Sequence, residues 1–267
     1  MLKDITLGQY FPGTSPVHRL DPRLKIVLVT AYIAALFLVK GAAAYVLMAL
    51  FNVAVIAIAR LNPKLILRGL KPMVFIVALT SVMHMLYSPG ERELFSFWVF
   101  RVTVEGVYTA AFMVTRILLL VSVTFLMTYT TSPIMLTDAI ERLMGPLKVI
   151  RVPVHELAMM MTIALRFIPT LIEETDKIMS AQKARGADFE SGGLFRRAKA
   201  LIPLLVPLFV SAFRRADELA MAMEARCYHG GQGRTRMKQL RLTRLDALAG
   251  LLCALWLAGA VSLRVFL

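Results

Sequence analysis

Two short stretches of the chain carry an arginine in the same local pattern. They are Ala181–Gly186 and Ala222–Cys227, and each reads Ala-x-x-Ala-Arg followed by a small residue. The guanidinium of arginine donates hydrogen bonds in a fixed fork, which suits paired contacts with carboxylates or carbonyl oxygens. Small neighbours let a partner protein close around that group. The residues therefore predict a protein-contact site made of Ala184, Arg185, Gly186, Ala225, Arg226 and Cys227.

Each arginine is expected at the C-terminal tip of an amphipathic helix. Weakly polar residues at steps of three or four lead to Arg185 and to Arg226. The two lines are Leu171, Thr175, Ile178, Gln182 and Ala212, Ala216, Leu219, Met223. A simpler interpretation is that an arginine in a last turn only complements the helix dipole, with Gly186 as an ordinary C-terminal cap. Because the same spacing of weakly polar residues precedes both arginines, we favour the interpretation that each arginine binds one of two similar partner subunits.

Outside these two stretches, the sequence does not indicate a nucleotide-binding, metal or catalytic site. There is no G-x-x-x-x-G-K-[ST] phosphate loop, and Gly230–Gly233 lacks both the lysine and the strand–helix setting, so it is interpreted as a flexible loop. No two histidines or cysteines have metal-ligand spacing. Glu173, Glu174 and Asp176 are interpreted as a solvated helix face. We expect no catalytic, cofactor or metal site in this chain.

The helices that must position these tips belong to a membrane protein. The chain has 267 residues, of which 58% are hydrophobic, and its mean hydropathy is +0.68. Five apolar runs lack the period-two alternation of barrel strands, so they are expected to be membrane-spanning helices of about 20 residues with their flanks. The predicted spans are Ile26–Val39, Ala43–Ala59, Pro72–Tyr87, Val107–Tyr129 and Ala247–Leu267.

The net charge of +14 is explained by topology rather than by nucleic-acid binding. Lysine and arginine gather before the first span, between the second and third, and before the fifth, which are predicted to face the cytoplasm. These residues are Arg19, Arg23, Lys25; Arg60, Lys64, Arg68, Lys71; Arg234, Arg236, Lys238, Arg241 and Arg244. The prediction is a multi-pass protein of the cytoplasmic membrane with its N-terminus inside and its C-terminus outside.

The predicted fold class is all-α: a polytopic helical membrane protein with a cytoplasmic helical domain. Residues 1–129 hold an N-terminal lead-in and four spans, residues 130–245 the cytoplasmic coupling helices, and residues 246–267 the last span. Within the cytoplasmic part, Leu201–Phe213 is apolar, too short to span and interrupted by two prolines, which predicts a kinked helix buried against other helices or lying at the interface. Asp21-Pro22 has the form of a helix start.

The chain resembles the transmembrane T component of energy-coupling factor transporters, a class of ABC importer. The resemblance rests on Ala184–Gly186 and Ala225–Cys227, on Gly8–Gly13 followed by His18–Arg23, and on Arg166–Pro169. It covers essentially the whole chain. Cys227 departs from the glycine of the first motif; it is still small, so the arginine contact is expected to survive, while the geometry of the cap is left open.

This resemblance implies that two ABC ATPase subunits each take one motif arginine into a surface groove. ATP and Mg²⁺ are expected on those partners and no cofactor on this chain, which is not itself an enzyme. A separate membrane-embedded S component would bind the substrate, usually a vitamin and sometimes a transition-metal ion. ATP binding and hydrolysis would move the coupling helices and topple the S component to deliver it.

Two other classes of function fit the sequence less well. An intramembrane enzyme would need His, Asp or Glu clustered in the spans, and the sequence has no such cluster. A self-sufficient permease or channel would be expected to repeat its spans around a midplane site, and only the arginine motifs repeat. Arg116 lies midway along the fourth span; it is expected either to bond a polar group on a neighbouring helix or to mark a contact with the S component.

Overall fold

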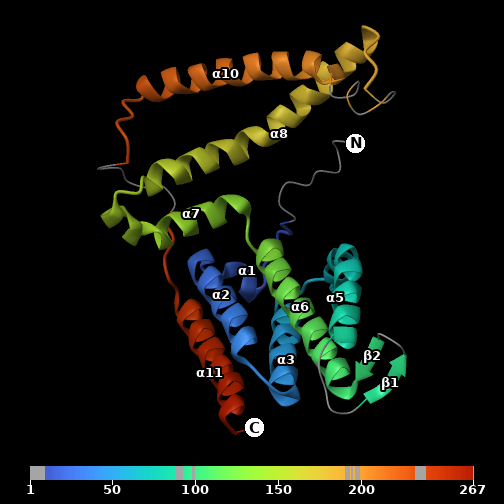
Figure 1. The fold of residues 1–267 in the computed structure, drawn as a ribbon. Coiled ribbons are helices and arrows are strands. Elements are labelled where there is room, and N and C mark those ends of the chain that lie inside the picture. Colours follow the sequence, from blue (N-terminus) through green and yellow to red (C-terminus); the bar gives the residue numbers. More distant parts are fainter. Residues whose placement is uncertain are drawn as a thin grey trace. The chain divides into compact units, whose positions relative to one another are not determined.

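The computed structural model describes residues 10–87, 93–97, 100–189, 193, 195, 199–231 and 239–266. The predicted features at Gly8, Gln9, Gln232, Gly233, Arg234, Arg236, Lys238 and Leu267 lie outside these residues. The chain divides into two compact units, one made of residues 8–139 with 239–267 and the other of residues 140–238 with the first seven. Nearly all described elements are helices, which confirms the predicted fold class (Figure 1).

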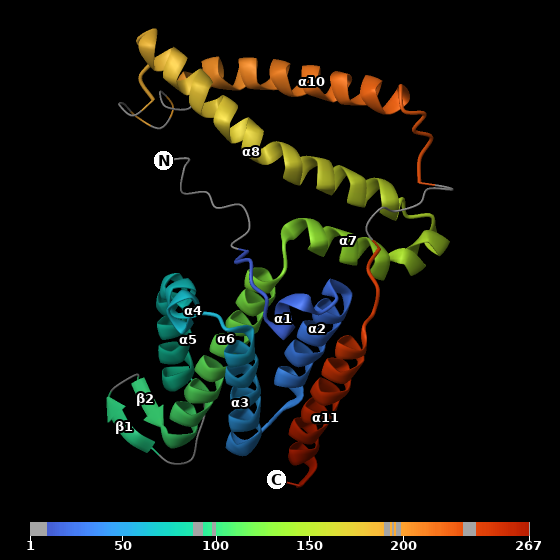
Figure 2. The same cartoon turned by 180° about the vertical axis from the view of Figure 1, so that it is seen from behind.

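The first unit is a helical bundle. Its elements are α1 (Pro16–Arg19), α2 (Pro22–Leu38), α3 (Ala42–Ala59), α4 (Pro63–Leu70), the 3-10 turn η2 (Lys71–Met73), α5 (Val74–Tyr87), α6 (Val104–Thr130) and α11 (Arg244–Phe266). A short antiparallel hairpin of β1 (Glu93–Phe97) and β2 (Phe100–Thr103), which the sequence analysis did not predict, joins α5 to α6. Figures 1 and 2 show α2, α3, α6 and α11 side by side, with α5 against α6.

Five helical stretches are long and apolar enough to cross a membrane: Ala42–Ala59, Pro63–Leu86, Val104–Thr130, Val154–Ala184 and Arg244–Leu263. Four correspond to predicted spans. The third predicted span is too short, because helix continues back from Pro72 through η2 and α4 to Pro63. The remaining stretch, Val154–Ala184, corresponds to no predicted span and lies in the segment predicted to be cytoplasmic. The predicted first span is α2, whose 17 residues are at the lower end of the spanning range of about 17–25.

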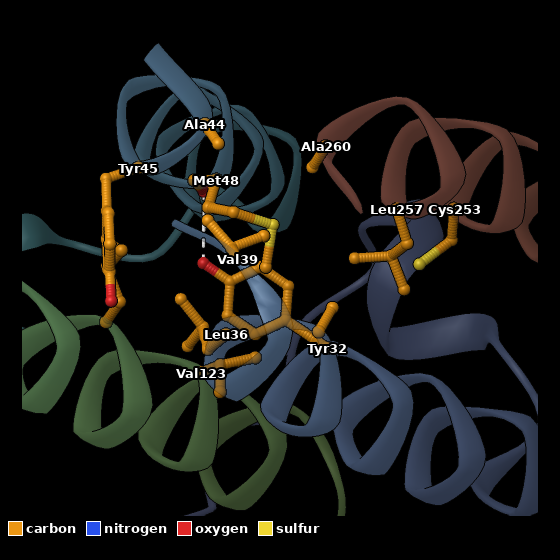
Figure 3. Close-up of a cluster of buried hydrophobic side chains, with 12 residues drawn as sticks. Tyr32, Leu36, Val39, Ala44, Tyr45, Met48, Val123, Cys253, Leu257 and Ala260 are labelled. Atoms are coloured by element: carbon orange, nitrogen blue, oxygen red, sulfur yellow. Dashed lines mark hydrogen bonds between the residues drawn. The ribbon is translucent and has the colours of Figure 1, made fainter. Parts of the chain in front are cut away.

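The core of the bundle is where α2, α3, α6 and α11 meet. Tyr32 and Leu36 from α2 pack on Met48 from α3, and all three are almost fully buried. The Tyr32 hydroxyl donates to the Met48 carbonyl oxygen at 3.0 Å, so its polar end is satisfied inside the apolar cluster (Figure 3). Cys253 and Leu257 complete the cluster from α11.

Polar contacts anchor the ends of the bundle helices. The predicted start of α2 is confirmed: the Asp21 side chain accepts from the Arg23 backbone N–H at 2.9 Å, with Pro22 at the first helical position. In the lead-in, the Phe11 N–H donates to the Tyr129 carbonyl at 3.0 Å at the end of α6. Lys25 is buried, and its ammonium donates to the Thr130 carbonyl at 2.9 Å.

The second unit is built on two long helices, α8 (Val154–Ala184) and α10 (Ile202–Glu224). It also contains the 3-10 helix η3 (Gly145–Ile150) and the end of α7 (Pro133–Leu143). Both long helices continue through an internal proline, Pro169 in α8 and Pro207 in α10. The helix predicted over Leu201–Phe213 is therefore only the first half of α10. Most of its apolar side chains are exposed, whereas Leu204 is buried; the exposed ones are Ile202, Leu205, Val206, Phe209, Val210 and Phe213.

Candidate functional site

The first arginine tip is the C-terminal end of α8. Arg185 is the C-cap residue, and Gly186 follows it with φ +86°, a left-handed conformation that glycine adopts without strain. The Gly186 N–H donates to the Lys183 carbonyl at 3.0 Å, and the Ala187 N–H donates to the Gln182 carbonyl at 2.9 Å. This pair of bonds is a Schellman motif, which satisfies the last free carbonyls of the helix. The arginine is therefore held where the helix stops.

The second tip repeats this geometry at the end of α10. The Cys227 N–H donates to the Glu224 carbonyl at 2.8 Å, and the Tyr228 N–H donates to the Met223 carbonyl at 3.1 Å. Cys227 takes the left-handed position with φ +54°, so Arg226 has the same place in the motif as Arg185. The cap geometry that was left open at Cys227 is a Schellman motif, as at the first tip.

Both arginines are available to a partner. Arg185 and Arg226 are exposed, and so are Ala184, Gly186, Ala225 and Cys227. Within the described parts of the chain, neither guanidinium has a hydrogen-bond or ion-pair partner. Each therefore presents its donors to solvent beside small neighbours. Its contact with an ATPase stays a prediction.

Direct contacts hold α8 and α10 together. The Glu174 carboxylate accepts from Arg215 Nη2 at 2.6 Å and also from the Ser211 hydroxyl. The prediction that Glu174 belongs to a solvated face is therefore wrong. Glu174 lies three residues after Leu171 and four before Ile178, so it shares their side of the helix, and α10 packs there. Glu173, in contrast, is exposed as predicted.

The two tips lie at opposite ends of the α8–α10 pair. Gln182 Nε2, one turn before Arg185, donates to the carbonyl of Pro203 at 3.4 Å, so the first tip lies beside the beginning of α10. The second tip is at the other end of that helix, as the ribbons in Figures 1 and 2 show. A helix of 23 residues is about 35 Å long. The arginines are therefore spaced widely enough for two separate protein subunits.

The segment after the second tip folds back onto the start of α8. Gly231 lies so close to the His155 ring that a side-chain Cβ would meet it at 2.3 Å. His155 Nδ1 is 2.9 Å from a carboxylate oxygen of Glu141. Gly231, interpreted as part of a flexible loop, is thus packed against His155, and Gly230 beside it has a left-handed φ of +94° with open space around it. No local pattern indicates this contact, because it joins segments that are separated along the chain.

Arg116 has its polar partner inside the bundle. Its Nε and Nη2 donate to the Tyr45 hydroxyl at 2.9 and 2.6 Å, and its guanidinium lies 5.5 Å from the centre of the Phe37 ring. Of the two roles expected for Arg116, bonding to a neighbouring helix is the one that the structure shows. Across the described residues, no group of three His, Cys, Asp or Glu side chains is placed to hold a metal ion.

The fold defines a polytopic helical membrane protein, and sequence comparison gives its family. The cobalt transport protein family, CbiQ, matches residues 13–237. The energy-coupling factor transporter transmembrane protein EcfT of Thermosediminibacter oceani is 52% identical over 263 residues, which are 98% of this chain and 99% of that protein. The chain belongs to this family of energy-coupling factor transporter transmembrane components, which confirms the resemblance.

Other members are similar over nearly the same length. The EcfT protein of Acidaminococcus fermentans is 56% identical over 251 residues, covering 94% of this chain and 93% of that protein. The EcfT protein of Bacillus subtilis is 48% identical over 246 residues, covering 92% and 93%. The match therefore includes both arginine tips as well as the bundle.

Proposed function

We propose that this chain couples two cytoplasmic ABC ATPase subunits to a membrane-embedded S component, so that ATP hydrolysis drives uptake of a vitamin or another micronutrient. The observation that carries the proposal is the pair of matched tips at opposite ends of α8 and α10. Each tip presents an exposed, unpaired arginine on a satisfied helix end, and about 35 Å of helix separates them. One chain can therefore hold two copies of one partner.

The ATPases supply the chemistry in this proposal. ATP and Mg²⁺ bind to them, and the chain contributes no catalytic group. Each motif arginine enters a groove of one ATPase and pairs with carboxylate or carbonyl oxygens there. Because the guanidinium is at the end of a long helix, a movement of the groove is transmitted along α8 or α10. The ion pair of Glu174 with Arg215 keeps the two helices moving together.

The exposed apolar face of α10 supports contact with the S component. Phe209 is 60% exposed and Phe213 68% exposed, and they lie on one side of the helix with Ile202, Leu205, Val206 and Val210. A contiguous apolar face of this kind marks a protein or membrane contact. We assign it to the apolar surface of the S component, which would then follow the coupling helices.

The proposed topology has the N-terminus inside and the C-terminus outside the cytoplasmic membrane. It is supported by the lysine and arginine residues near the ends of the bundle helices where α2 and α11 begin and α3 ends. The α8 helix is assigned to the cytoplasmic side although it is apolar enough to span, because it belongs to the same compact unit as both tips.

A charge reversal at both tips tests the proposal. The variant Arg185→Glu/Arg226→Glu should lose co-purification with the ATPases and lose ATP-driven uptake, because a carboxylate repels the acceptors in the grooves. The matched control is Arg214→Glu, which reverses another exposed arginine of α10 and should leave both properties unchanged. Unchanged association and uptake in the double variant would refute the role of the arginines.

A further inference from the structure

The bundle contains a cavity that neither the arginine tips nor the coupling role explains. It has a volume of about 350 Å³ and is half enclosed by α1, α2, α3, α6 and α11. Its lining is almost entirely apolar and includes Leu28, Val55, Leu126, Leu248 and Ala249. Pockets that bind small ligands in proteins have volumes of about 300–1,000 Å³, so this cavity is large enough for one.

The cavity runs along the helices from one end of the bundle toward its middle. On α11 the lining extends from Leu245 to Cys253, a rise of about 12 Å. One leaflet of a bilayer has about 15 Å of hydrocarbon, half of the roughly 30 Å core. At the inner end Asn52 is buried, and its Oδ1 accepts from the Ser122 hydroxyl at 2.9 Å. The apolar lining therefore ends near the depth that a lipid tail would reach.

Arginines flank the cavity lining at the end of the bundle where α2 and α11 begin. Three exposed arginines stand next to lining residues in the chain: Arg19 beside Leu20, Arg244 beside Leu245, and Arg60 two residues after Ile58. None of the three has an ion-pair partner in the described chain. The carboxylates at this end, Asp21 and Asp246, are buried and hydrogen-bonded within the bundle. Exposed arginines at a membrane surface attract anionic lipid headgroups.

We propose that this cavity binds one acyl chain of an anionic phospholipid, with the phosphate of its headgroup at Arg19, Arg60 and Arg244. The apolar lining is the environment that a lipid tail prefers, and the surrounding membrane supplies such lipids. The lipid would lie in the leaflet that meets the end of the bundle where α2 and α11 begin. It would fill the space between α11 and the other helices and hold the bundle as one unit.

Native mass spectrometry of the full chain released from membranes tests the proposal. The purified chain is offered phosphatidylglycerol and phosphatidylcholine at equal concentration, and we expect it to retain one phosphatidylglycerol with about tenfold preference. Ala249→Trp fills the cavity and should remove the retained lipid. Ala254→Trp places the same bulk on an exposed position of α11 outside the cavity and should not. Equal retention of the two lipids, or by the two variants, overturns the proposal.

Photo-crosslinking of the unaltered chain gives a second test that does not depend on how a variant folds. A phosphatidylglycerol with a photoreactive group in its acyl chain should label the lining residues Leu28, Val55 and Met127. Labelling confined to outward-facing residues such as Val53 and Leu255, both more than 60% exposed, would show that lipid only surrounds the bundle and would overturn the assignment.

Discussion

The carboxylate of Asp246 accepts a hydrogen bond from the backbone N–H of Asp21 at 2.7 Å, although 225 residues separate the two along the chain. Asp246 is 2% exposed, and its other oxygen accepts from the N–H and the hydroxyl of Thr243, each at 2.7 Å. One side chain therefore caps the start of α11 and fixes it to the start of α2. Residues 140–238 separate the two parts of the bundle unit in the sequence, and this bond joins those two parts.

Replacement of Asp246 should lower the stability of the bundle. Asp246→Ala leaves the buried Asp21 N–H without an acceptor, which costs about 1–3 kcal/mol. Each kcal/mol should lower the unfolding midpoint of the detergent-solubilised chain by about 2–4 °C. Asp246→Asn keeps one carbonyl oxygen, so its unfolding midpoint should lie between those of the unaltered chain and Asp246→Ala. The control Asp217→Ala, at an exposed carboxylate of α10, should leave the midpoint unchanged. An unchanged midpoint for Asp246→Ala would contradict the structural role of this bond.

Arg116 and Tyr45 should behave as an energetically coupled pair. The guanidinium donates two hydrogen bonds to the hydroxyl, so removing either partner strands the other in an apolar setting. The loss of stability in Arg116→Leu/Tyr45→Phe should be smaller than the sum of the two single losses by about 0.5–3 kcal/mol. Thermal unfolding of the four proteins measures this difference. Strictly additive losses would mean that the pair does not interact.

The second tip should become more stable when its strained residue is replaced by glycine. Cys227 has φ +54°, and the left-handed conformation costs a residue with a side chain about 1–2 kcal/mol. Glycine avoids this cost but loses about 0.5–1 kcal/mol more backbone entropy on folding. Cys227→Gly should therefore raise the unfolding midpoint slightly, and Gly186→Ala at the first tip should lower it. The opposite pair of signs would show that the two caps differ in geometry.

The apolar face of α10 should control association with the S component separately from the ATPases. Phe209→Asp introduces a charge into this face and should abolish co-purification of the S component. Binding of the ATPases at the tips should persist, because the substitution leaves both motif arginines and their helix caps unchanged. Glu218→Asp, at an exposed polar position of α10, is the control. Loss of the ATPases together with the S component would instead indicate a misfolded helix.

The sequence predicted the parts of this structure that depend on local periodicity. Both arginine tips could be found because spacing, a small residue after the arginine and duplication are all local signals. The ion pair of Glu174 with Arg215 could not be predicted in the same way. A carboxylate on a helix is expected to face solvent unless the packing of α10 against that helix is known. Lys25 was used only to orient the chain, whereas the structure buries its ammonium against the end of α6.

Two further features depended on contacts between distant segments. The strands β1 and β2 have five and four residues, so the alternation of apolar and polar residues in them is too short to indicate a hairpin by itself. The full length of α8 is likewise not indicated locally, because a proline inside a helical pattern suggests an end. In both cases the local pattern permits several outcomes, and packing of the rest of the chain selects one.

The most direct test of the coupling role is the number of ATPase subunits bound by each arginine variant, measured by native mass spectrometry of the purified complex. The unaltered chain should bind two ATPases. Arg185→Glu and Arg226→Glu should each bind one, and the double variant none, because each tip holds one subunit independently. Two ATPases retained by either single variant would contradict the account.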